Sequence, residues 1–454
     1  MSTASSAHSR APLVSPRRIV QVSMLGFAFL LPFLTWQQAA GAAVLALLFN
    51  GLVLPPLNIG LRKHPMPPAT PSSEEGMWTG LILYPISVLL LVLIYRHHLE
   101  VAAGAWAIMA LGDGAAGVAG EALGRPSLPW NPRKTWAGFV AFVLAGTAGA
   151  SLLALWVNPS LPAGKALLIS ALAALLGAAV ESAPIGLDDN LTVPLVCGGF
   201  MFCSWLTARS ALDSNLPYLG RRLALATAVN LTFALIALRL KTASRSGAAL
   251  GFVLGTLVYL GYGWKSFLLL FTFFLLGSLA TRMGYARKAA RGIAESRGGA
   301  RSWREALANV GPGAFFAVLV ITTHQEHAFL IALVAAFAEA AGDTVSSEIG
   351  QWLSSRTYLI TTFRPVPAGE NGGVSLPGTA AGLAAAALIA ALGWRLGLTG
   401  IGGAALALAA AMAGNLLDSL LGATLERPGL VTNGIVNFAG TALAGALALA
   451  FTLR

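Results

Sequence analysis

Long apolar stretches follow one another along almost the whole chain, and short polar or basic segments separate them. A run of about 20 apolar residues is long enough to cross a bilayer as a helix. Runs rich in Ala, Leu and Gly do not alternate as the strands of a membrane barrel do, so the pattern predicts an all-α polytopic membrane protein with roughly 14–15 transmembrane helices. The predicted spans lie near residues 20–34, 39–57, 78–95, 101–122, 137–157, 165–184, 191–208, 222–239, 247–261, 264–280, 308–323, 327–341, 374–394, 400–422 and 434–453.

Composition and charge place the chain more closely. Hydrophobic residues make up 56% of the sequence and charged residues only 10%, which excludes an ordinary soluble domain. The formal net charge is +11, and the basic residues cluster between spans. Basic loops favour cytoplasmic exposure and contact with phosphates or anionic headgroups, with no role for nucleic acid. Residues 1–18 lack a small-residue cleavage site, so we expect an uncleaved first helix in the cell (inner) membrane.

The polar signatures form two sets, which divide the chain into two fused helical bundles. The first half carries its signatures before about Ala208, and the chain restarts with a long apolar stretch at Arg222. Each half has a Gly-Asp step near its middle, although no repeat of residue identities is visible. We therefore predict two membrane domains, residues 1–220 and 221–454.

The richest stretch of the first half is LGDGAAGVAGEALGRPSLPWNPRKTWAGF, residues 111–139. Asp113, Gly117, Gly120 and Gly124 recur at spacings that place them on one helix face. Such a face can simply let a neighbouring helix approach, or it can let the phosphates of a nucleotide approach the backbone beside an acid that holds a cation. The Lys134-Thr135 pair favours the second interpretation, because it supplies a cation and a hydroxyl at the start of a helix.

A second signature, ESAPIGLDDNLTVPL, spans residues 181–195. Asp188, Asp189 and Asn190 could cap the helix that follows. Two acids and an amide, with Glu181 close by in sequence, also make a second cluster for metal binding or for a catalytic base.

These three motifs, in this order and spacing, resemble the CTP-dependent polyprenol kinase family of dolichol kinase and phytol kinase. The resemblance covers about Arg17 to Trp205 and implies transfer of the γ-phosphoryl group of CTP to an isoprenoid alcohol in the membrane. Family members often carry a His near the N-terminus, where this chain has Gln21. The residues that the resemblance places at the nucleotide and the metal are Gly112, Asp113, Gly114, Gly117, Gly120, Lys134, Thr135, Asp188, Asp189 and Asn190, with Asp113, Lys134, Asp188 and Asp189 as catalytic groups.

The second half has polar clusters on several apolar helices. Glu339 and Asp343 are four residues apart, as are Asn433 and Asn437, so each pair lies on one helix face. Several such clusters more plausibly converge on a cation and its phosphates than serve as isolated structural acids. The basic segment around Arg297, Arg301 and Arg304 is equally well explained as an inside-positive loop or as a phosphate-binding segment.

The motifs GDTVSSEIG, PVPAGENGGVSLPGTAAG, GNLLDSLLGATLE and VTNGIVNF resemble the membrane family of plant phytyl-phosphate kinase and its animal relatives. The resemblance covers about Ala243 to the C-terminus and implies phosphorylation of an isoprenyl monophosphate to the diphosphate. Gly434 stands where members often have an acid or an amide. The candidate catalytic and metal residues are Asp343, Glu348, Asp418, Asn433 and Asn437, and the candidate nucleotide contacts are Arg364, Asn371, Gly372, Gly373 and Ser375.

Together the resemblances imply a bifunctional membrane isoprenoid kinase that uses Mg²⁺ and CTP, or another nucleoside triphosphate, at sites facing the cytoplasm. Its partners would be an isoprenoid alcohol such as phytol or geranylgeraniol, the corresponding monophosphate, the nucleotide and the bilayer. Two alternatives stay open: a CTP-dependent lipid cytidylyltransferase, and a lipid or ion-coupled transporter in which the intramembrane acids bind the ion. The sequence also leaves open whether the protein forms a homo-oligomer.

Overall fold

The protein is a helical membrane protein. The computed structural model describes residues 23–53, 73–184, 186–295, 299–354 and 356–453. Gln21, Arg297 and the N-terminal basic residues lie outside this part of the chain. Eleven helices in the described part are long and apolar enough to cross a membrane, which confirms the predicted fold class with fewer spans than the apolar windows suggested. The windows overcount because some of them correspond to short helices, such as the nine-residue η1.

The chain divides into two compact units, Met1–Trp205 and Leu206–Arg454. This division lies before the boundary that the sequence predicted after residue 220, because α10 runs unbroken through that position from Arg209 to Arg239.

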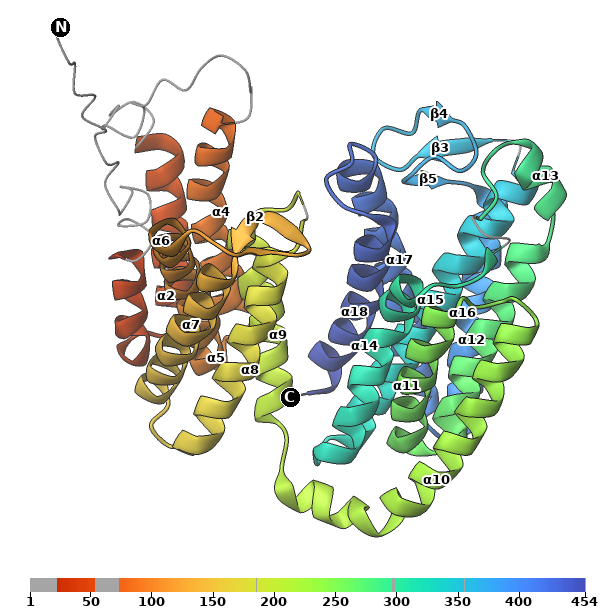
Figure 1. Ribbon diagram of the computed structural model, residues 1–454, viewed down its shortest axis with the longest axis horizontal. Helices are drawn as coiled ribbons and strands as arrows, with labels where there is room; N and C mark the ends of the chain where they lie inside the picture. The colour runs from red at the N-terminus through yellow and green to blue at the C-terminus, as the bar shows by residue number, and fades with distance from the viewer. Residues whose placement is uncertain (1–22, 54–72, 185, 296–298, 355, 454) are drawn as a thin grey trace, which may run out of the picture. The chain divides into compact units, whose positions relative to one another are not determined.

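The first unit is built from helices and one short β-hairpin (Figure 1). Thr35 and Thr135 start two of these helices as N-caps, with side chains that accept hydrogen bonds from backbone N–H groups of the first turn. The elements are η1 (Leu25–Phe33), α2 (Trp36–Leu48), η2 (Phe49–Val53), α4 (Ser73–Ile94), α5 (Leu99–Ala107), η3 (Ile108–Gly112), α6 (Asp113–Leu123), β1 (Ser127–Leu128), β2 (Asn131–Thr135), α7 (Trp136–Val157), α8 (Ala163–Ser182) and α9 (Asp189–Trp205).

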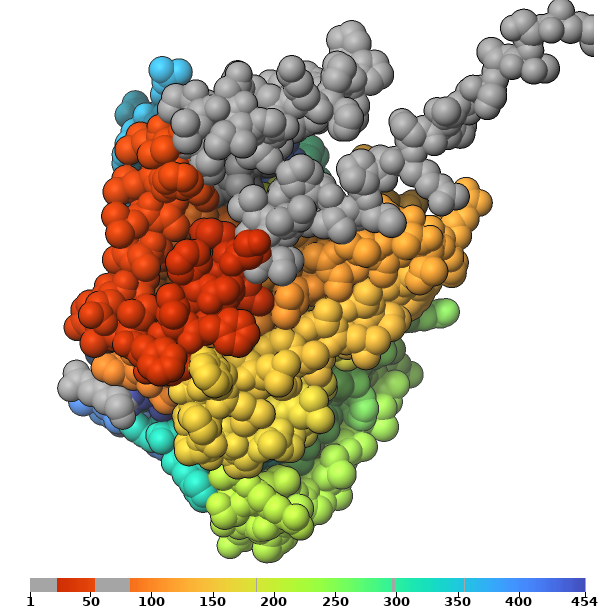
Figure 2. Space-filling model, turned by 90° about the vertical axis from the view of Figure 1, so that its left-hand side faces the viewer, coloured from red at the N-terminus to blue at the C-terminus, as the bar shows by residue number. Residues whose placement is uncertain are grey.

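The core of the first unit is the nearly completely buried segment formed by α5 and η3, which packs against α7 and α9. The outer side of the unit is apolar instead of polar. Figure 2 shows the red η1 and α2 region beside the orange-to-yellow α7 and α8, and Trp156 of α7 packs edge-on against Phe29 and Phe33 of η1. Leu144, Leu152 and many other leucines of α7 and α8 are exposed, as expected for a surface that faces lipid.

The second unit is a larger bundle with a small antiparallel sheet in the order β4-β3-β5. Its central helix is α15, which packs against α12, α14, α16, α17 and α18 and is 94% buried in its most apolar window (Figure 1). The elements are α10 (Arg209–Arg239), α11 (Arg245–Tyr262), α12 (Trp264–Arg282), α13 (Tyr285–Ala290), α14 (Trp303–Thr322), α15 (Glu326–Leu353), β3 (Thr357–Leu359), β4 (Pro365–Val366), β5 (Gly373–Val374), α16 (Leu376–Arg395), α17 (Ile401–Leu421), η5 (Gly422–Glu426) and α18 (Asn433–Thr452).

Local sequence determines where several of these helices begin and end. Ser244 and Ser375 cap α11 and α16 through their hydroxyl groups, and Ser302 forms a capping box with Glu305 at the start of α14. Gly263 has a positive φ of 71° and ends α11, so that α12 can return beside it.

Candidate active sites

In the first unit, α5, η3 and α6 form one continuous segment, Leu99–Leu123, that carries Asp113. The chain takes a π-helical turn over Ile108–Gly112, immediately before this acid. Such turns are rare and occur often at functional sites. Gly112 packs against the Phe142 ring of α7, where an added Cβ would lie 2.9 Å from the ring. The glycine beside Asp113 therefore has a packing role.

The β-hairpin holds Lys134 beside the C-terminal end of α8. The indole Nε1 of Trp130 donates to Ser182 Oγ at 3.2 Å, and Asn131 Nδ2 donates to the Ser182 carbonyl at 3.1 Å. These two bonds place Lys134 next to Glu181, with which it forms an ion pair. The Lys134 ammonium also lies 3.8 Å from Asp189 Oδ2 at the start of α9.

These charges change one another's protonation. Burial would lower the pKa of Lys134, but the carboxylates of Glu181, Asp189 and Asp113 outweigh burial and raise it. Burial raises the pKa of Asp189 to about 7, although Lys134 opposes this shift. Lys134 is therefore a firmly protonated cation, whereas Asp189 can accept a proton near neutral pH, as a general base must.

Asp188 and Asn190 form the turn that starts α9. Asp188 Oδ1 accepts hydrogen bonds from the backbone N–H of Asn190 at 2.9 Å and from its Nδ2 at 2.8 Å. This geometry matches the capping interpretation of the motif. Of the three neighbouring residues, Asp189 is the one whose carboxylate faces Lys134.

A cavity of about 330 Å³ lies between α6, the hairpin and the start of α7. Gly120 and Gly138 allow these elements to approach: an added Cβ at Gly138 would lie 2.9 Å from the carbonyl oxygen of Ala116. Thr135 caps α7 by accepting from Gly138 N at 3.1 Å. Of the predicted residues, Gly112, Gly114, Asp188, Asp189 and Asn190 are not part of the cavity lining, whereas Asp113, Gly117, Gly120, Lys134 and Thr135 are, together with Arg133 and Glu181.

In the second unit, the ends of several helices meet around one polar cavity. Glu348 lies near the end of α15 and Asp418 near the end of α17, while Ser375 and Asn433 stand at the starts of α16 and α18. The connection through Arg301 leads into α14 at the same place. The alternating directions of successive helices therefore bring together motifs that are far apart in the sequence.

The loop between β4 and β5 closes over the end of α17. Gly372 has a positive φ of 74°, and an added Cβ would lie 2.4 Å from the backbone nitrogen of Ala423. Gly422 faces the same loop, since an added Cβ there would lie 2.9 Å from Gly372 N. A side chain at either position would push the loop away from η5, so these glycines define the cavity wall.

The polar cavity has a volume of about 220 Å³. Arg364 is the one predicted second-unit residue outside its lining, because it lies on the exposed turn between β3 and β4. The predicted residues that do line the cavity are Asp343, Glu348, Asn371, Gly372, Gly373, Ser375, Asp418, Asn433 and Asn437.

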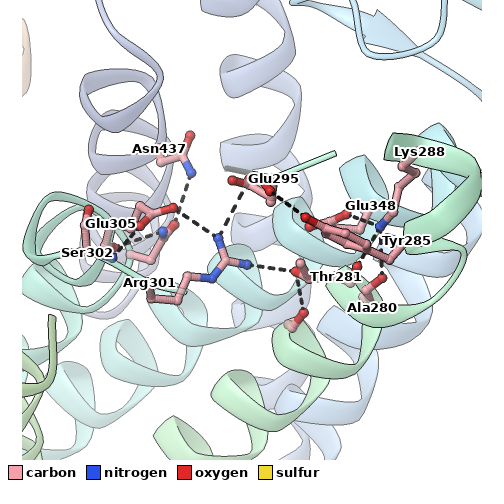
Figure 3. Close-up of polar contacts among 12 residues, drawn as sticks. Ala280, Thr281, Tyr285, Lys288, Glu295, Arg301, Ser302, Glu305, Glu348 and Asn437 are labelled. Atoms are coloured by element: carbon pink, nitrogen blue, oxygen red, sulfur yellow. Dashed lines mark hydrogen bonds and ion pairs between the residues drawn. The ribbon is translucent and has the colours of Figure 1, made fainter. Parts of the chain in front are cut away.

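The structure adds polar residues that the sequence motifs did not single out. Arg301 Nη2 donates to Thr281 Oγ1 at 3.3 Å, and its Nη1 lies 3.6 Å from Glu305 and 4.0 Å from Glu295 (Figure 3). Burial raises the pKa of Glu295, which Arg301 partly offsets. Glu305 could have been found only as a helix-capping residue, from the spacing Ser302-x-x-Glu305. Glu295, Glu305, Asn309 and Glu426 also line the cavity.

A buried ion pair fixes one wall of this cavity. Lys288 of α13 is fully buried and pairs with Glu348 of α15 (Figure 3). Its ammonium also donates to the carbonyls of Ala280 at 3.3 Å and Thr281 at 3.0 Å. Glu348 thus has a cationic partner within the protein.

Glu339, which shares a helix face with Asp343, lies outside the cavity lining. It is 1% exposed and accepts a hydrogen bond of 2.6 Å from Thr441 of α18. An added Cβ at Gly414 or Gly440 would lie within 2.7 Å of its side chain. Glu339 therefore ties α15 to α17 and α18 in the packed interior.

The oxygen atoms around the cavity suit a hard cation. Among the described residues, Glu348 Oε1, Asp418 Oδ2 and Asn437 Oδ1 are buried side-chain oxygens without a hydrogen-bond partner, and all three residues line the cavity. Within the same part of the chain, no group of three His, Cys, Asp or Glu side chains is arranged to hold a metal ion. Mg²⁺ is commonly held by one or two carboxylates together with substrate phosphates, so these residues fit a metal that arrives with a nucleotide.

Comparison with known proteins identifies the family. The model of the integral membrane protein family DUF92 matches residues 228–446. An uncharacterized membrane protein of Synechocystis is 38% identical over 199 residues, which cover 42% of this chain and 77% of the relative. The chain belongs to the DUF92 family of integral membrane proteins. The matched DUF92 region contains every residue that lines the polar cavity.

Two plant proteins are also similar to this DUF92 member. The chloroplastic protein VTE6 of Arabidopsis thaliana is 37% identical over 213 residues, which cover 45% of this chain and 64% of VTE6. Chloroplastic phytol kinase 1 of the same plant is 28% identical over 158 residues, which cover 33% of this chain and 50% of that protein. No solved structure matches the chain.

Proposed function

We propose that this protein is a bifunctional membrane isoprenoid kinase. The first unit would phosphorylate an isoprenoid alcohol, and the second would phosphorylate the resulting monophosphate to the diphosphate. The observation that carries the proposal is the polar cavity of the second unit, on which residues of four separate sequence motifs converge. The similarity to phytol kinase 1 supports the chemistry.

The first step transfers the γ-phosphoryl group of CTP to the hydroxyl oxygen of the alcohol. A new oxygen–phosphorus bond forms, the bond to the β-phosphate oxygen breaks, CDP leaves and the hydroxyl proton passes to a base. Asp189, with its pKa near 7, is the best candidate for that base. Lys134 would neutralise phosphate charge, and Asp113 would hold the metal at the cavity wall.

In the second step the acceptor is already a phosphate, so its negative charge must be neutralised before a second phosphate can approach. Arg301 supplies a guanidinium for this purpose, and Asp418, Asn437 and Glu348 would hold Mg²⁺ through their unpaired oxygens. A metal there would neutralise charge on the transferred group. The fusion also makes physical sense, since the monophosphate is confined to the bilayer near the second site.

The orientation in the membrane follows from the basic residues of the second unit. Arg239, Arg245, Arg282 and Arg304 all lie at the ends of α10, α11, α12 and α14 that carry the polar cavity. Basic residues accumulate on the cytoplasmic side of membrane proteins. The nucleotide would therefore enter from the cytoplasm.

The test uses the purified full-length chain in detergent with Mg²⁺, geranylgeraniol and CTP labelled at either the α- or the γ-phosphate. A kinase places only the γ-label on the lipid, whereas a cytidylyltransferase places the α-label there. A wild-type protein that forms no labelled lipid with alcohol or monophosphate refutes the kinase proposal and favours a transporter.

Three variants test the division between the units. We expect Asp113→Asn to block monophosphate formation but still convert supplied monophosphate, and Asp343→Asn to accumulate monophosphate. The control is Asp213→Asn, because Asp213 is an exposed acid of α10 that pairs with Arg209 and lines neither cavity. Equal loss of both steps in both site variants would overturn the two-site division.

A further inference from the structure

A second cavity in the second unit is apolar and adjoins the polar one. It lies between α10, α11, α12 and α14, with Phe233, Phe252, Phe271 and Phe274 among its lining residues. Its exposed lining is almost entirely apolar. Arg301, Glu305 and Asn309 line both cavities, so the apolar and polar spaces meet at these three side chains.

We propose that the apolar cavity binds the first isoprene units of the acceptor, with Arg301 at the junction binding its phosphate. This inference rests on the kinase function proposed for the second unit. The occupant is an isoprenyl monophosphate because the two joined spaces require one molecule with a narrow apolar chain and an anionic head. A free nucleotide would leave the apolar space unfilled, and a neutral alcohol would leave Arg301 without an anion.

Arg301 has donors to offer a phosphate. Its Nη1 lies 3.6 and 4.0 Å from the nearest carboxylates, which is longer than a hydrogen bond, and its printed hydrogen bond is the one from Nη2 to Thr281. Glu305, the closer acid, accepts a hydrogen bond from the backbone N–H of Ser302 at the start of α14. A guanidinium carries five N–H donors in a planar fork, which matches the geometry of a phosphate.

The glycines of α11 give the cavity a measurable depth. Gly247 packs against the backbone of Arg301, Gly251 lines the middle of the cavity, and Gly255 packs against Asn230 at its far end. Eight residues of helix separate the first and last of these glycines, which corresponds to roughly 12 Å. An isoprene unit adds four chain carbons, or about 5 Å when extended. The cavity therefore holds about two isoprene units, and the rest of a longer chain continues into the bilayer.

Gly251 is the position that decides which chains fit. An added Cβ there meets no atom within 4 Å, so a larger side chain would extend into open space instead of clashing with the protein. Gly402 near the start of α17 offers the matched control, because its added Cβ also meets nothing and it does not line the cavity. Both glycines lie in helices, so the same substitution changes helix propensity equally.

The experiment compares the wild type, Gly251→Leu and Gly402→Leu with dimethylallyl monophosphate and geranylgeranyl monophosphate. We expect Gly251→Leu to lower kcat/KM for the long acceptor by roughly 10- to 100-fold, the usual effect of filling a packed space, and to leave the short acceptor nearly unchanged. Gly402→Leu should match the wild type with both. Identical chain-length preferences in all three proteins would overturn the inference while leaving the kinase function standing.

A binding measurement separates failure of the inference from failure of the kinase function. Geranylgeranyl monophosphate without nucleotide should raise the melting temperature of the wild type and of Gly402→Leu, but not that of Gly251→Leu. If this pattern appears without any phosphoryl transfer, the chain-binding site stands and the kinase proposal fails. Equal stabilisation by phosphatidate would overturn the isoprenyl assignment, because an ordinary lipid would then fill the same space.

Discussion

The buried pair of Lys288 and Glu348 allows a quantitative test of how the wall of the second-unit cavity is held. Lys288 is fully buried, and its other partners are the backbone carbonyls of Ala280 and Thr281. Glu348→Leu would leave a buried ammonium without a counter-charge. Removing one partner of such a pair typically costs about 3–5 kcal/mol. Lys288→Met should also destabilise, because it leaves the carboxylate of Glu348 alone in the interior.

The double variant Lys288→Met/Glu348→Leu should recover much of this loss, since it leaves neither charge unpaired. For a unit of this size, each kcal/mol shifts the melting temperature by roughly 2–4 °C, so each single variant should melt about 6–20 °C lower than the wild type. Thermal unfolding in detergent measures the three variants. A double variant that melts as low as the sum of the singles predicts would refute the coupling.

An exposed pair in the same unit provides the internal comparison. Arg427 Nε lies 2.7 Å from Glu370 Oε1, with side chains 46% and 31% exposed. Solvent screens such pairs, and they typically contribute about 0–1 kcal/mol. The same double-variant cycle on this pair should therefore give a coupling several times smaller than that of Lys288 and Glu348. Similar couplings for both pairs would show that burial is not the deciding factor.

Two further predictions concern the first unit. Because burial raises the pKa of Asp189 to about 7, its carboxyl is protonated below that pH and ionised above it, so alcohol phosphorylation should increase as pH rises through about 7; an acid limb that persists unchanged in the residual activity of Asp189→Asn would contradict this assignment. Thr135→Ala removes the hydroxyl that caps α7 and should cost about 1 kcal/mol in thermal unfolding, whereas Thr135→Ser keeps the cap; equal stability of the two variants would show that the cap contributes nothing.

The sequence by itself determined the helical membrane class and most residues of the second-unit cavity. Apolar runs predict spans because each helix must satisfy its own backbone in lipid. Polar residues near helix ends, such as Ser375, Asp418 and Asn433, could be predicted to meet because successive spans run in opposite directions. The same reasoning placed Lys134 beside a helix start in the first unit, where the structure has it at the end of β2 next to α7.

Tertiary packing alone decided which charges are paired and which face the cavities. Glu339 and Asp343 share a helix face, yet Glu339 is enclosed by Gly414, Gly440 and Thr441 while Asp343 lines the cavity. Asp188 caps its own helix, whereas the next residue, Asp189, faces Lys134. Periodicity gives the direction of a side chain from its own helix but not the neighbour that it meets.

The junction between the apolar and polar cavities shows the same limit most clearly. Sequence alone explained Arg301 equally well as part of a basic loop and as a phosphate ligand. The structure places it where α11 and α14 begin beside the end of α12, in contact with both cavities. That position depends on contacts between segments distant in the sequence, which no local pattern of hydrophobic and polar residues specifies.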